Sequence, residues 1–158
     1  MNTQLSFKTL LILSFNTLLI FGVYNTRIVA QCEKANLQSE ENSLTKRAEE
    51  YFFASNQHDL AKISSQISEE IEYVSTGVGS FNGKKDVLDM MSSFFTKFPN
   101  VSWKIINDPA SINSSVVLRF EMRLHPNDAP ITGTEVLTFA DDGQIVRITV
   151  IRDSETNL

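Results

Sequence analysis

The sequence has few of the residues on which covalent cross-links, metal sites and nucleophilic catalysis depend. Its 158 residues include one cysteine and two histidines. A single cysteine excludes a disulfide within the chain, so the domain must be stabilised by its core alone. The spacing of His58 and His125 does not place them with a carboxylate, as a metal site requires. The sequence also lacks a glycine-rich phosphate loop, a nucleophile elbow and a cysteine–histidine pair, and we expect no metal or other cofactor.

Positive charge is scarce as well, because 14 Lys and Arg residues stand against 19 Asp and Glu residues, for a net charge of −5. No basic patch interrupts this acidic composition, which argues against nucleic acid or an anionic membrane surface as a partner. The sequence contains no internal repeat or low-complexity segment, and its length suits one compact domain.

The most apolar segment lies at the N terminus. One cation, Lys8, precedes an apolar run over residues 10–24, and Ala30 offers a small residue for cleavage. This layout is typical of a secretory signal peptide. The run is shorter than the roughly 20 residues that a spanning helix needs, and Asn16 interrupts it. We expect residues 1–30 to be removed, leaving a secreted or periplasmic protein without a stable membrane span and with a net charge of −7.

Two alternatives to this cleavage stay open. The apolar run could remain as a membrane anchor, or Cys32 could carry a lipid, although Gln31 is larger than the residue expected before a lipidated cysteine. Without a lipid, the Cys32 thiol could be free or pair between chains. Asn100 and Asn113 lie in glycosylation sequons, which matter only in a eukaryotic source.

The remaining chain is expected to hold a flexible lead-in at residues 31–42, one domain at 43–153 and a tail at 154–158. Helical periodicity begins at residue 43, and a short second helix is expected over residues 59–67. A third helix begins at Lys84 and ends at Pro99. Its apolar stripe, typical of a core-facing helix, consists of Val87, Met90, Met91, Phe94 and Phe98.

Strand patterns occupy the rest of the domain. They are predicted over residues 70–76, 102–107, 114–125, 131–139 and 144–152, with a loop at Gly77–Gly83. Residues 114–125 alternate clearly, with Val116, Leu118, Phe120, Met122 and Leu124 on one face. Helices followed by an antiparallel run of strands predict an α+β fold, with helices on one face of a curved sheet.

Three segments resemble the SnoaL-like, nuclear transport factor 2-like superfamily. They are "RAEEYFFASNQHDLAKISSQISEEIEYVS", "FNGKKDVLDMMSSFFTKFPNVSWKI" and "ITGTEVLTFADDGQIVRITVIRD". The resemblance covers about residues 43–153. It implies a cone-like, curved antiparallel sheet packed by about three helices around an apolar pocket, often with dimerisation through the sheet. The superfamily includes cyclases, isomerases and dehydratases as well as proteins that only bind or assemble, so the fold does not settle the function.

The ketosteroid isomerases of this superfamily give the sharpest comparison. Tyr51 falls where they keep an oxyanion-hole tyrosine, and Glu135 falls where they keep a protonated aspartate. Their catalytic base would match Ser75, or Val74 with a one-residue slip, and neither side chain can take a proton from carbon. The resemblance therefore implies a pocket that holds an oxyanion without a base. Its apolar wall is expected to include Phe52, Met91, Phe94 and Phe120.

The strand pattern independently draws attention to Glu135, because it shares a strand face with Leu137 and Phe139. In an apolar cavity its pKa would rise and leave it a hydrogen-bond donor. Alternatively, it pairs with Arg147 or Arg119, or reaches solvent at the strand end. Tyr51 has an alternative too, as a core tyrosine with its hydroxyl bonded to the backbone.

The leading hypothesis is an exported domain that binds a planar or steroid-sized apolar compound with a polar group. One alternative is a metal-independent acid–base enzyme of the cyclase, isomerase or dehydratase type. Another is a dimeric assembly module that uses the outward residues Arg119, Glu121 and Arg123. We expect a homodimer through that face, with self-complementary charge pairs across a two-fold axis.

Overall fold

The computed structural model of the chain describes residues 34, 39 and 43–153. The predicted signal peptide, Cys32, most of the lead-in and the tail at 154–158 lie outside the described residues. Within the described part, no helix is long and apolar enough to cross a membrane.

Three helices occur in the described residues. Residues 43–56 form the N-terminal helix, which α2 (Leu60–Gln66) and α3 (Lys84–Lys97) follow. The turn between the first two places His58 at a φ of +53°. Asp59 then caps α2, because its side chain accepts a hydrogen bond from the backbone N–H three residues further on at 2.9 Å. All three helices were predicted from the periodicity, with small shifts at their ends.

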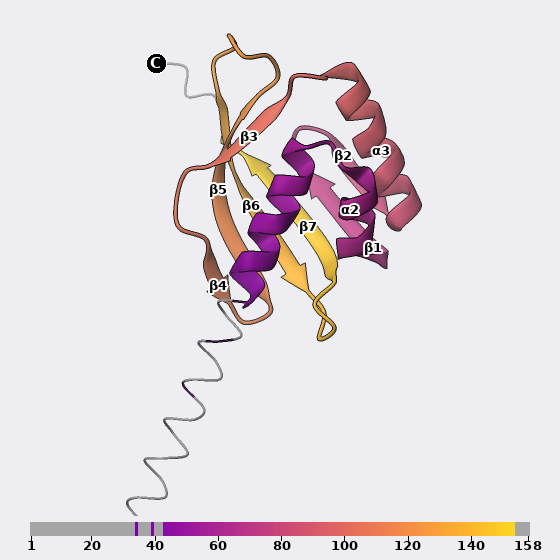
Figure 1. Cartoon of the computed structure of the whole chain (residues 1–158), viewed down its shortest axis with the longest axis vertical. Helices are drawn as coiled ribbons and strands as arrows, with labels where there is room; N and C mark the ends of the chain where they lie inside the picture. The colour runs from indigo at the N-terminus through magenta and orange to yellow at the C-terminus, as the bar shows by residue number, and fades with distance from the viewer. Residues whose placement is uncertain (1–33, 35–38, 40–42, 154–158) are drawn as a thin grey trace, which may run out of the picture. The chain divides into compact units, whose positions relative to one another are not determined.

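Seven strands form one sheet in the order β2-β1-β7-β6-β5-β3, and β4 pairs with β5 beside this path (Figure 1). The pairing of β1 with β7 is parallel, and the other pairings are antiparallel. The strands are β1 (Ile67–Ser75), β2 (Gly79–Asn82), β3 (Ser102–Ile105), β4 (Ala110–Ile112), β5 (Ser115–Arg123), β6 (Ile131–Phe139) and β7 (Ile145–Arg152). The predicted α+β class with a curved sheet is confirmed, and the sheet is mixed because of the one parallel pairing.

The sequence pattern missed two short strands. Gly77–Gly83 was predicted as a loop, whereas β2 occupies its second half, and β4 lies where no strand was expected. Both strands are short and mostly exposed, so they show no alternation of apolar and polar residues. The first strand was also placed too late, because β1 begins at Ile67, whose pairing with Ile145 comes before a register shift.

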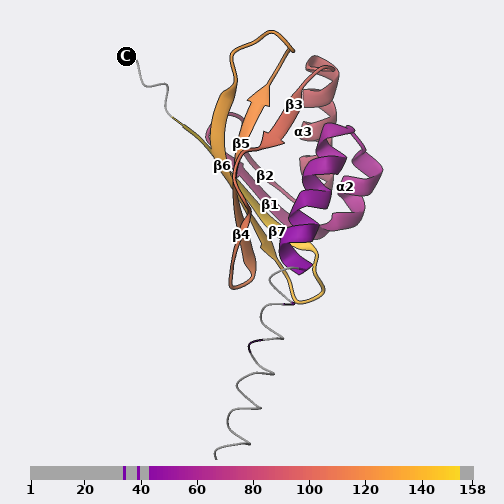
Figure 2. The same cartoon turned by 60° about the vertical axis from the view of Figure 1, so that its left-hand side comes forward.

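The helices lie on one face of the curved sheet, here called the inner face, as Figure 2 shows edge-on. The predicted alternation of β5 is confirmed, because Val116, Leu118, Phe120 and Met122 are buried. On β6, Glu135, Leu137 and Phe139 are buried together on the inner face. The core thus lies between this face and the three helices, and a carboxyl group is buried within it.

Candidate functional site

A pocket of about 80 Å³ lies between the inner face of the sheet, the N-terminal helix and α3. The structure brings all seven residues that the sequence predicted for a ligand site to the wall of this one pocket. Their contact with a ligand stays a prediction. These residues are Tyr51, Phe52, Ser75, Met91, Phe94, Phe120 and Glu135.

The sheet register places the polar groups of the pocket in a row. Glu135 on β6 pairs with Val150 on β7, and Val150 pairs with Ser75 on β1. Neighbouring strands lie about 4.8 Å apart, so Glu135 and Ser75 are separated by about 10 Å across the inner face. Val74 lies next to Ser75 in the chain and therefore projects to the opposite face. Of the two positions that match an isomerase base, only Ser75 lines the pocket.

Glu135 is a buried acid whose charged form is disfavoured. Its exposed fraction is 6%, and burial raises the pKa of its carboxyl group from 4.5 to about 8. At neutral pH the group is therefore mostly protonated and can donate a hydrogen bond. The alternative ion pairs for Glu135 are wrong, because Arg147 pairs with Glu72 at 3.4 Å and Arg119 with Asp153 at 2.6 Å.

Tyr51 lies on the N-terminal helix and lines the same pocket as Glu135. It is 4% exposed, and its pKa lies well above 10 because of burial and then because of the negative charge that Glu135 would carry. Tyr51 therefore stays protonated and remains a hydrogen-bond donor across the physiological range. Two neutral donors, one from a helix and one from the sheet, thus line the same cavity.

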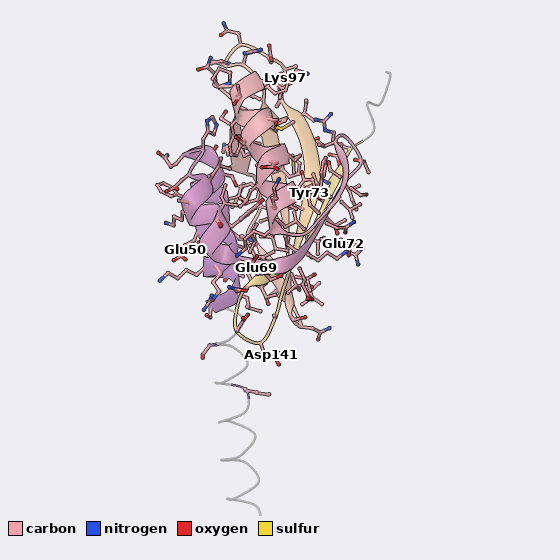
Figure 3. The ribbon with its side chains drawn as sticks, turned by 90° about the vertical axis from the view of Figure 1, so that its right-hand side faces the viewer. Glu50, Glu69, Glu72, Tyr73, Lys97 and Asp141 are labelled. Atoms are coloured by element: carbon pink, nitrogen blue, oxygen red, sulfur yellow. The ribbon has the colours of Figure 1, made fainter. Side chains whose placement is uncertain are left out.

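The sequence did not identify three further polar residues of the pocket, namely Ser55, Tyr73 and Arg152. Tyr73 precedes Ser75 by two positions on β1, and both side chains point to the inner face. Figure 3 labels Tyr73 near the middle of the view, and Glu50, Lys97 and Asp141 at the edges of the molecule. Strand alternation from Ser75 could have revealed Tyr73. Arg152 could not be found in this way, because its place depends on the pairing of β7 with both β1 and β6.

Aromatic side chains form the apolar part of the wall. Trp103 lines the pocket and contacts Phe94 and Phe95, with ring centroids 6.1 and 6.2 Å apart. Asn56 fixes the Trp103 backbone, since its side-chain amide makes two hydrogen bonds of 2.8 Å to the N–H and C=O groups. The end of the N-terminal helix therefore positions this wall.

The pocket offers donors but no base. Among the residues that the structure describes, Glu135 is the one carboxylic acid in its wall, and it is mostly protonated at pH 7. His58 stacks on Phe95 at 4.4 Å, and His125 lies against Phe98 at 6.3 Å, so each histidine is held by a different ring. Within the described part of the chain, no three His, Cys, Asp or Glu residues are grouped to hold a metal ion.

The outer face of the sheet differs from the expectation that its arginines are available for charge pairs with a second chain. Arg119 is already paired with Asp153 of its own chain, and Thr132 donates a hydrogen bond of 2.6 Å to the same carboxylate. Arg123 donates to the backbone carbonyl of Asp128. These arginines therefore have partners within the chain, and Ile151 on the same face is 49% exposed.

A protein-family model described as the SnoaL-like domain matches residues 48–148. None of the curated proteins compared with the chain matches it significantly. Among solved structures, a candidate isomerase of the SnoaL-like family from Agrobacterium tumefaciens is similar, with a TM-score of 0.60 and 18% identity over 69% of this chain and 96% of that one.

Two other solved structures share the fold. A candidate ketosteroid isomerase from Kribbella flavida has a TM-score of 0.64 and 16% identity over 75% of this chain and 84% of its own. A SnoaL-like protein of unknown function from Burkholderia thailandensis has a TM-score of 0.62 and 19% identity, covering 71% and 97%. At these identities the likeness concerns the fold alone.

Proposed function

Since the chain belongs to the SnoaL-like domain family, we propose that it is an exported binding protein whose pocket takes a small hydrophobic molecule with a carbonyl or phenolic oxygen. Tyr51 and Glu135 hold that oxygen. The ring or chain of the ligand packs against the aromatic wall that Phe94, Phe95 and Trp103 form.

One observation carries this proposal: a buried carboxyl group that is mostly protonated at neutral pH lines an apolar cavity that a buried tyrosine also lines. A buried polar group is costly unless it has a hydrogen-bond partner. A ligand oxygen accepts from both donors at once, and each hydrogen bond contributes on the order of 1 kcal/mol. The pocket therefore favours a ligand with one acceptor atom at its buried end.

The pocket volume narrows the size of the ligand. Its 80 Å³ falls below the roughly 300–1,000 Å³ typical of sites for drug-sized molecules. A single-ring compound suits this space better than the steroid-sized one that the sequence suggested. Any larger ligand must extend through the mouth of the pocket.

Metal-independent acid–base catalysis is the second candidate. The pKa of Glu135 at about 8 suits a general acid near neutral pH. A reaction that begins with proton abstraction also needs a base, and no other carboxylic acid or histidine among the described residues lines the pocket. Binding is therefore the function that the site supports better.

Acetophenone is a suitable probe, because its carbonyl oxygen only accepts hydrogen bonds and its single ring suits the cavity. Its dissociation constant would be measured by NMR titration of the exported chain at pH 6. Tyr51→Phe should weaken binding about five-fold, which corresponds to about 1 kcal/mol. Glu135→Leu should weaken it similarly, whereas the outward-facing control Glu72→Gln should leave it unchanged.

The pH dependence gives a second test of the same proposal. Above pH 8, ionised Glu135 presents only acceptors, so acetophenone affinity should fall in the wild type. Glu135→Gln keeps an N–H donor at every pH, so its affinity should stay constant. Equal pH profiles for the two proteins would exclude Glu135 as the donor.

A further inference from the structure

Arg152 is the one cationic side chain in the described wall of the pocket, and its surroundings differ from those of the other arginines. It is the last residue of β7, where it pairs with Gly133 of β6. Its backbone N–H donates to the Thr76 hydroxyl at 2.9 Å, which extends the β1–β7 pairing past the end of β1. Arg152 thus lies two residues along β7 from Val150, which stands between Glu135 and Ser75.

The neighbouring Gly77 leaves the space that the Arg152 side chain occupies. A Cβ atom added to Gly77 would lie 2.5 Å from Nε and 2.6 Å from Cζ of Arg152. Such distances are too short for any non-bonded contact, so a side chain at position 77 must displace the guanidinium group. The absence of a side chain at Gly77 therefore fixes where the positive charge lies.

The Arg152 guanidinium has no acidic partner within 4 Å among residues 43–153. The side chain of every other arginine in this range has a carboxylate or a backbone carbonyl as its partner. Arg119 and Arg147 pair with carboxylates, and Arg47 and Arg123 donate to backbone carbonyls. Arg152 instead lines the pocket, where burial raises the pKa of Tyr73 well above its usual value and the Arg152 charge only partly opposes that rise.

Two hydroxyl groups line the same pocket as the Arg152 guanidinium. Tyr73 and Ser75 both line the pocket, and the Ser75 hydroxyl accepts a hydrogen bond from the Gly77 backbone N–H at 3.3 Å. The Ser75 hydroxyl also forms a side-chain hydrogen bond with Tyr73, so one hydroxyl proton of this pair remains available for a ligand. A guanidinium group and hydroxyl donors together match the planar oxygens of a carboxylate.

We propose that the ligand is a small aromatic or alicyclic carboxylic acid, whose carboxylate is bound by Arg152 while its carbonyl or phenolic oxygen is bound by Tyr51 and Glu135. This inference rests on the proposed function and adds a second polar end to the ligand. Glu135 and Arg152 lie on adjacent strands, two residues apart in register, so their Cα atoms are about 8 Å apart. One ring with substituents at opposite ends spans such a separation.

The test compares acetophenone with 4-acetylbenzoate and its neutral amide, 4-acetylbenzamide, by NMR titration of the exported chain. Wild type should bind 4-acetylbenzoate at least ten-fold more tightly than the amide, because a hydrogen bond to a charged group contributes more than a neutral one. Arg152→Gln should lower the affinity for 4-acetylbenzoate at least ten-fold and change acetophenone binding less than two-fold.

A second variant keeps the experiment decisive if Arg152→Gln folds poorly. Gly77→Ala retains the arginine and displaces its guanidinium, so it should cause the same selective loss of 4-acetylbenzoate affinity. Arg147→Gln removes an exposed arginine from the same strand and should leave all three affinities unchanged.

The outcomes separate the two proposals. If acetophenone binds but the carboxylate brings no advantage, or if Arg152→Gln weakens all three probes equally, Arg152 is not a carboxylate site and the proposed function stands. If no probe binds the wild type, the proposed function fails and this inference fails with it.

Discussion

The Glu135→Gln variant should be more stable than the wild type, and this difference in the free energy of unfolding should grow as the pH rises. Burial raises the pKa of Glu135 in the folded state to about 8, whereas the unfolded chain has its ordinary value of 4.5. Below pH 4.5 Glu135 is protonated in both the folded and the unfolded state, so it does not lower the free energy of unfolding. As the pH rises from 4.5 to 8, the unfolded state releases the proton and the folded state keeps it. Stability is therefore lost through this window.

The magnitude follows from the size of the pKa shift. Each unit corresponds to about 1.4 kcal/mol, so the wild type should lose about 3 kcal/mol by pH 7 and about 5 kcal/mol above pH 8, relative to pH 4. Glu135→Gln has no proton to release and keeps a side chain of nearly the same shape. Its free energy of unfolding should thus exceed that of the wild type by an amount that grows with pH.

Urea unfolding of both proteins at several pH values between 4 and 9 measures this difference directly. The other titrating groups are common to both proteins, including Asp153, whose pKa is lowered by hydrogen bonds from Thr132 and Arg119. Their contributions cancel in the difference. Two stability curves that run parallel from pH 4 to pH 8 would refute a buried, protonated Glu135.

Three other predictions concern export, assembly and catalysis. N-terminal sequencing of the exported protein should begin near Gln31, and retention of residues 1–30 in a membrane fraction would show an anchor instead. Light scattering at micromolar concentration should give a homodimer through the outer sheet face, and Ile151→Asp should dissociate it because that side chain is half exposed there. A monomeric wild type would contradict this. The wild type should not isomerise a ketosteroid, because Ser75 cannot act as the base. Turnover that the Ser75→Ala substitution abolishes would instead favour the hypothesis of an acid–base enzyme.

The sequence predicted elements whose side chains repeat with a clear period. The alternation from Val116 to Met122 and the stripe on α3 each reflect one buried face, which periodicity reports directly. Glu135 was recognisable for the same reason, as a polar residue in line with two apolar ones. The short exposed strands β2 and β4 bury almost nothing and leave no such pattern.

Features that depend on contacts between distant segments could not be predicted in this way. The parallel pairing of β1 with β7 joins residues more than seventy positions apart, such as Ser75 and Val150. This pairing places Arg152 beside Gly77 and Tyr73. The charged end of the pocket is therefore a product of the sheet register, which no local pattern in the sequence encodes.

A crystal structure of the exported protein grown at pH 6 with saturating acetophenone tests the central claim most directly. The carbonyl oxygen should lie within about 3.2 Å of both the Tyr51 hydroxyl and a Glu135 carboxyl oxygen, with the ring against the aromatic wall. A pocket without ligand density at saturating acetophenone, or a carbonyl oxygen directed away from both donors, would contradict the account.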